Sequence, residues 1–157
     1  MDDIVGSDTG LIHLIASILA LVFGTFVLAY KKGNRYHKMA GHLYVISMLV
    51  LLITSFMLYR LFDGFGIFHY AAILSLGLLA MGIIPVLTKR PKSKWLLQHL
   101  SFMYWSVIGL YAAFASEVLT RIPETPFFGM VGLATVVIMG IGGLVFIRKR
   151  SKWQGIR

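Results

Sequence analysis

Long apolar segments separated by short polar ones dominate the chain. A helix needs about 20 apolar residues to cross the hydrocarbon core of a bilayer. Five segments reach that length, and they are Leu11–Tyr30, His42–Leu61, Ile67–Thr88, Leu96–Leu119 and Phe127–Ile147. Unpaired backbone groups are too costly in lipid, so each segment must be helical. The pattern predicts an all-α integral membrane protein with five spans, forming a single domain over residues 1–157.

The fifth span differs from the other four in its composition. It is rich in glycine, contains no histidine, and carries no charge before Arg148. Small residues allow two helices in a membrane to approach closely. We therefore expect the first four spans to form an up-down four-helix bundle. The fifth span is expected to flank this bundle, as a packing helix or as the contact of a homodimer.

Charged residues are few and unevenly distributed. The chain is 58% hydrophobic and 13% charged, which is far more apolar than a soluble domain of this size. All basic residues except Arg60 and Arg121 lie in the first loop, the third loop and the C-terminal tail, and the acidic residues lie on the opposite side. This is the positive-inside pattern, with the N-terminus outside and the C-terminus in the cytoplasm. The net charge of +9 thus reflects topology and contact with anionic headgroups, and no nucleic-acid partner is expected.

Several kinds of chemistry are excluded by what the chain lacks. It has no cysteine, so disulfides, thiol chemistry and iron–sulfur sites are excluded. It contains no nucleophile–base triad, phosphate-binding loop or metalloprotease motif. The first apolar segment is long and has no basic region before it, so we expect a retained span and no cleaved signal peptide.

Four histidines lie near span ends at two levels of the predicted bundle. His13 and His69 lie near the outer ends of spans one and three, whereas His42 and His99 lie near the inner ends of spans two and four. Alternate helices are diagonal in an up-down bundle, and the two levels are roughly 20 Å apart. Neutral imidazole is a good axial ligand of haem iron. The arrangement therefore suits two b-type haems, each held by two histidines, that move electrons across or within the membrane.

The surroundings of these histidines agree with a flat cofactor. The face of the first span that carries His13 consists of small residues and valine, which let a helix or a macrocycle approach closely. That face contains Ala16, Ser17, Ala20, Gly24 and Val27. Haem propionates require cations at the membrane surface. The candidates are Arg35, Lys38 and Lys94 on the inner side and Arg60 and Arg121 on the outer side.

The same residues allow other interpretations. Histidine is amphipathic and is stable at an interface, so a protein without a cofactor is also consistent. Such a protein would be a small transporter, a channel subunit or an assembly partner; another metal or a proton-linked role also remains open. His37 stands five residues before His42 and does not share its helix face, which favours a loop residue or a propionate neighbour. Glu117 and Arg121 have the spacing of a surface ion pair, with a proton or substrate site as the alternative.

Short motifs in the first half of the chain resemble a known family. The pattern Lys32-Gly33, His37-Lys38, Gly41-His42 and Tyr44, with the later His69 and His99, resembles an uncharacterised bacterial family of small multi-span membrane proteins. The resemblance covers roughly residues 10–120. It implies a multi-pass protein of the bacterial cytoplasmic membrane and brings no established activity.

The histidine arrangement also resembles that of the cytochrome b561-type di-haem bundles. In those proteins alternate helices supply pairs of axial histidines at both membrane faces. By that resemblance His13 would pair with His69, and His42 with His99. It implies a transmembrane electron-transfer oxidoreductase with an unidentified redox partner. The substrate-binding segments of those cytochromes have no match in this chain.

Overall fold

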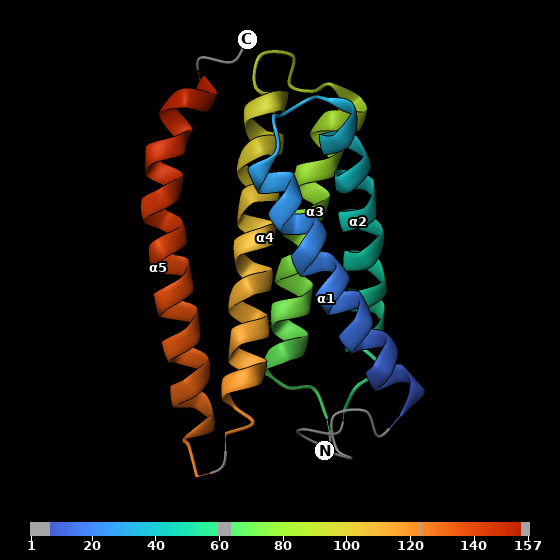
Figure 1. Ribbon diagram of the computed structural model, residues 1–157, viewed down its shortest axis with the longest axis vertical. Coiled ribbons are helices and arrows are strands. Elements are labelled where there is room, and N and C mark those ends of the chain that lie inside the picture. The colour runs from blue at the N-terminus through green and yellow to red at the C-terminus, as the bar shows by residue number, and fades with distance from the viewer. Residues whose placement is uncertain (1–6, 60–63, 123, 155–157) are drawn as a thin grey trace. The chain divides into compact units, whose positions relative to one another are not determined.

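Five long helices make up the computed structural model, which describes residues 7–59, 64–122 and 124–154 (Figure 1). The helices are α1 (Asp8–Ala29), α2 (Arg35–Ser55), α3 (Ile67–Thr88), α4 (Trp95–Leu119) and α5 (Phe127–Gln154). All five are long and apolar enough to cross a membrane, and the described residues contain no strand. The predicted all-α fold with five spans is confirmed. Helix α3 has the predicted bounds, and α4 begins one residue earlier than predicted.

The chain forms two compact units. The first comprises Met1–Leu76, and within it α1 packs against α2. The second comprises Gly77–Arg157, and within it α4 packs against α5. The first ten residues of α3 belong to the first unit and its remaining residues to the second.

The prediction for the second span was wrong by about two turns, because α2 begins inside the basic segment. The Asn34 side chain accepts a hydrogen bond from the His37 backbone N–H at 2.7 Å, which caps the helix before Arg35. An N-cap of this kind satisfies a backbone donor that otherwise has no partner. The helix ends at Ser55, so residues 56–59, which were predicted to be helical, form a turn and an irregular segment. His37 consequently lies in the first turn of α2 and not in a loop.

Two other helices also extend beyond their apolar segments. Helix α1 begins at Asp8, three residues before the predicted start, because the Ser7 hydroxyl accepts a hydrogen bond from the Gly10 backbone N–H. Helix α5 continues past Ile147 through the basic residues to Gln154. Positive charges near a helix C-terminus interact favourably with its dipole, so the end of the apolar segment does not end the helix.

In the first unit, α1 is buried along the face that the sequence predicts. Its buried residues are Ala16, Ser17, Ala20, Gly24 and Val27. The buried face of α2 carries larger side chains, of which Tyr44 and Met48 are at most 1% exposed. Small residues on one helix and large residues on the other permit close packing.

In the second unit, α5 is attached to α4 by a buried hydrogen bond. The Tyr104 hydroxyl donates to the Gly142 carbonyl at 2.7 Å. A Cβ atom at Gly142 would lie only 2.6 Å from Cγ2 of Ile108, so glycine is required for this approach. By contrast, a Cβ atom at Gly132 or Gly140 would meet nothing within 4 Å. Gly142 therefore serves packing within the unit, and a homodimer through the fifth helix stays a prediction.

Candidate functional site

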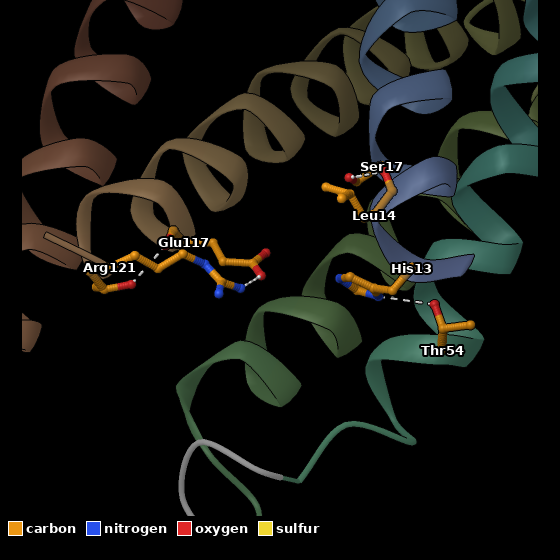
Figure 2. A network of polar contacts seen from close by, with 7 residues as sticks. His13, Leu14, Ser17, Thr54, Glu117 and Arg121 are labelled. Atoms are coloured by element: carbon orange, nitrogen blue, oxygen red, sulfur yellow. Dashed lines mark hydrogen bonds and ion pairs between the residues drawn. The ribbon is translucent and has the colours of Figure 1, made fainter. Parts of the chain in front are cut away.

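His13 is held at one end of the α1–α2 pair by a side chain of α2. Its Nδ1 atom lies 3.0 Å from Oγ1 of Thr54 (Figure 2). The Thr54 hydroxyl is also within hydrogen-bond distance of the Val50 and Leu51 carbonyls, at 2.8 and 3.0 Å. Two oxygens 2.8 Å apart repel each other unless a hydrogen lies between them, and a carbonyl can only accept, so the single Thr54 hydrogen is donated to the backbone and Thr54 accepts from His13. The His13 ring is therefore protonated at Nδ1, and in its neutral form Nε2 carries the lone pair.

His99 is held in the same way in the second unit. Its Nδ1 atom lies 2.8 Å from the Gly82 carbonyl oxygen, and because a carbonyl only accepts, Nδ1 must carry the hydrogen. Gly82 stands three residues before Pro85, which lacks an N–H and so weakens the backbone bonding of that turn of α3. Met103, one turn beyond His99, contacts the same glycine, because a Cβ atom there would lie 2.6 Å from the Met103 sulfur.

His69 is bound differently from these two histidines. It is 4% exposed, and its Nδ1 atom accepts a hydrogen bond from the Gly66 backbone N–H at 3.1 Å. The ring is stacked between Phe65 and Tyr59, with centroid distances of 4.6 and 4.9 Å. A neutral ring that accepts at Nδ1 carries its hydrogen at Nε2. That Nε2 atom is buried and has no hydrogen-bond partner among the described residues.

These hydrogen bonds decide which nitrogen could coordinate a metal. Coordination requires a lone pair, and a ligating histidine usually donates its other N–H to a carbonyl or another oxygen. His13 and His99 meet this condition at Nε2. In this geometry His69 does not, since ligation through Nε2 would require the ring to change its tautomer and give up the Gly66 bond. Haem thus fits the donor chemistry of His13 and His99 and does not fit His69 as it is held here.

His42 lies on the exposed side of the second turn of α2. From His42 to Thr54, the partner of His13, the helix rises about 18 Å. His13 and His42 therefore lie toward opposite ends of the α1–α2 pair. His42 belongs to the first unit and His99 to the second. The pairing of His13 with His69 and of His42 with His99 stays a prediction.

The predicted propionate contacts occupy several environments. Arg35, Lys38 and Lys94 are exposed, near the first residue of α2 or α4. Arg121 donates to Glu117 at 2.7 Å, so the predicted surface ion pair is confirmed (Figure 2). Both side chains of this ion pair are about 40% exposed, and an exposed ion pair contributes little to the stability of the fold. Arg60 lies outside the described residues.

Sequence reasoning missed the residues that position the histidines. Thr54 resembles any other polar residue near the end of a span, and only the α1–α2 packing brings it to His13. Gly82 had a partial signal, because a glycine close to Pro85 indicates a kinked turn, although the carbonyl that Pro85 leaves without a helical donor is that of Met81. Lys32 lies in the loop as predicted, but its role was missed, since its ammonium group binds the Val27 and Leu28 carbonyls at the end of α1. Among the described residues, no three His, Asp or Glu side chains gather as a metal site.

Thr54→Val is expected to lower the free energy of unfolding by about 1 kcal/mol, because it leaves the His13 Nδ1–H without its acceptor. Valine retains the shape of threonine, so packing is preserved. Chemical unfolding in detergent, compared with Thr25→Val as the control, measures the loss. The Thr25 hydroxyl donates to the backbone of its own helix and is exposed. Equal losses in the two variants would contradict a special role for the Thr54 hydroxyl.

Comparison with known proteins gives a family and no activity. The model of the family described as "Predicted membrane protein (DUF2306)" matches residues 10–148. This range covers α2, α3 and α4 completely and most of α1 and α5, and it extends beyond the resemblance seen in the sequence. No curated protein and no solved structure matches the chain. The family description and the five apolar helices agree on a multi-pass membrane protein.

Proposed function

For this chain, which belongs to the DUF2306 family of predicted membrane proteins, we propose that it binds haem b within the bilayer and passes electrons across or within the membrane. One observation carries this proposal. Two of the four candidate histidines, His13 and His99, each donate Nδ1–H to an oxygen of a neighbouring helix. This leaves Nε2 as the nitrogen with the lone pair, as in most metal-ligating histidines.

The residues around these histidines would hold the two rings in position for ligation. The Gly82 carbonyl fixes the rotation of the His99 ring, and Thr54 does the same for His13. A donated N–H also makes the ring a stronger base toward iron. The exposed Arg35, Lys38 and Lys94 would bind propionates at the membrane surface. When bound, haem would supply the one-electron chemistry, and the protein would supply ligands and a dry interior.

A second candidate function requires no cofactor, and the state of His69 favours it. That ring is packed among aromatic side chains and bonded to its own turn, which is how a structural histidine is held. The His99 bond to Gly82 also stabilises the turn of α3 that contains Pro85. In this interpretation the histidines join helices, and the protein acts as a transporter or channel subunit or as an assembly partner.

The first experiment is an absorption spectrum of the purified protein from a haem-sufficient host, before and after dithionite. Haem ligated by two histidines gives a sharp α-band on reduction, and the pyridine haemochrome gives the number of haems per chain. A colourless, well-folded helical protein would overturn the haem proposal and favour the second candidate.

His99→Gln tests the role of one ligand while keeping the fold. Glutamine retains an N–H donor for the Gly82 carbonyl but provides no imidazole. If His99 is an axial ligand, the absorbance of the α-band should fall by the amount that one haem contributes. His42→Ala should lower the absorbance by the same amount. His37→Gln is the matched control and should leave the band unchanged. Undiminished absorption in His99→Gln would contradict the assignment.

A further inference from the structure

We propose that the basic end of the second unit is a binding surface for the phosphate headgroups of anionic phospholipids. The basic end is defined by Arg90, Lys92, Lys94, Arg148, Lys149 and Arg150. These residues come from two segments far apart in the sequence, the connection before α4 and the last turns of α5. The proposal does not depend on the presence of haem.

The antiparallel pairing of α4 and α5 brings the two segments to the same end of the unit (Figure 1). The Tyr104–Gly142 bond gives the register of the pair, and Trp105 and Phe146 contact each other at 5.3 Å. Arg148 lies about 9 Å from Gly142 along the axis of α5. Lys94 lies about 15 Å from Tyr104 along the axis of α4. The difference of about 6 Å is comparable to the thickness of one headgroup layer. Both segments therefore reach the same layer of the membrane.

None of the six charges is neutralised by the described part of the protein. All six residues are exposed, and their side chains have no hydrogen bond or ion pair with a described residue. The acidic residues of this unit are Glu117 and Glu124. They lie at and just after the C-terminal end of α4, whereas the basic end lies at its N-terminal end. Six cations without a protein counterion require anions from the surroundings.

A neighbouring contact places this end at the membrane surface. The Lys89 ammonium group lies over the Trp95 ring, 3.9 Å from its centroid. Tryptophan is enriched at the headgroup level, where its amphipathic ring is most stable. Because Trp95 begins α4, the connection before it must lie among the headgroups. The lipid phosphate is the anion that is most concentrated in this layer, and we therefore identify it as the occupant.

The first unit has fewer available cations at its own basic segment. The Lys32 ammonium group binds the Val27 and Leu28 carbonyls, where it interacts with the partial negative charge at the C-terminus of α1. Lys31, Arg35 and Lys38 are exposed. These three form a matched control set, because they are the same kind of residue in the same number as either segment of the basic end.

The test uses the full-length protein in phosphatidylcholine vesicles that contain spin-labelled lipid. Labelled phosphatidylglycerol should associate with the protein at least about fivefold more strongly than labelled phosphatidylcholine. A factor of about five is the gain in affinity for an anionic lipid that a single surface cation provides. Raising the salt concentration should reduce this preference, since exposed charges are screened. Equal association of both lipids at low salt would overturn the proposal. It would also be overturned if inorganic phosphate at millimolar concentration abolished the preference.

Two triple variants locate the site. Arg90→Gln with Lys92→Gln and Lys94→Gln should remove most of the preference, and so should Arg148→Gln with Lys149→Gln and Arg150→Gln. The control is Lys31→Gln with Arg35→Gln and Lys38→Gln, which should retain most of it. Equal losses in all three would show a general charge effect and overturn the assignment. If a variant inserts in the wrong orientation, the lipid preference of the unmodified protein and its salt dependence still decide the matter.

Discussion

Gly142→Ala is expected to unfold the protein more easily than Gly140→Ala by about 2 kcal/mol. A Cβ atom at position 142 would lie 2.6 Å from Cγ2 and 3.3 Å from Cγ1 of Ile108. Isoleucine has one strongly preferred rotamer in a helix, so it cannot turn aside. Helix α5 must then move away from α4, which lengthens the buried Tyr104–Gly142 hydrogen bond.

The comparison with Gly140 isolates this packing effect. Both glycines lie in α5, and both substitutions gain the same intrinsic helix propensity. Position 140 is exposed, and a Cβ atom there meets nothing within 4 Å. The measurement is unfolding in mixed micelles with increasing denaturing detergent. Equal midpoints for the two variants would show that α5 is not held to α4 through Gly142.

His69→Ala is expected to lower the free energy of unfolding by about 3 kcal/mol, whereas His69→Phe should lower it by only about 1 kcal/mol. Alanine removes the ring that packs between Phe65 and Tyr59 and contacts Phe56. Phenylalanine restores the aromatic contacts but cannot accept from the buried Gly66 N–H. Unfolding of the apoprotein in detergent measures both changes.

The same two variants separate packing from ligation at His69. If the ring only packs, His69→Phe should keep whatever haem absorption the unmodified protein has. If the ring changes its tautomer and ligates iron, His69→Phe should lose absorption together with His13→Ala. A stability of His69→Phe as low as that of His69→Ala would contradict the packing role of the ring.

The number of helices and one helix face could be predicted from the sequence, because both depend on burial. Five apolar segments gave five helices, and α3 has its predicted bounds. The small-residue face of α1 is buried from Ala16 to Val27. Hydrophobicity and helical periodicity report directly on burial, whether the neighbour is lipid, another helix or a ligand.

The helix ends could not be predicted in this way, because polar residues can continue a helix outside the hydrocarbon core. The Asn34 side chain caps α2 in the middle of a basic segment, and α5 continues through Arg148. Apolar length marks the hydrocarbon thickness, whereas capping and helix propensity determine where the helix ends.

The protonation state of each candidate ligand also escapes sequence analysis. Counting histidines treats His69 and His99 alike, although one accepts at Nδ1 and the other donates there. The difference arises from the partner, a backbone N–H in one case and a carbonyl in the other. Only the local backbone places these groups, so a spacing argument can identify the histidines but not which nitrogen has the lone pair.

The Tyr104–Gly142 bond has a consequence for the order of assembly during synthesis. Tyr104 lies well inside α4, and the carbonyl that receives its hydroxyl belongs to a residue that leaves the ribosome 38 positions later. Until α5 is made, this phenol is a polar group facing lipid tails or the translocation channel. The cost of that exposure favours keeping α4 beside the channel until α5 arrives. The two helices should therefore enter the bilayer together, as one hairpin.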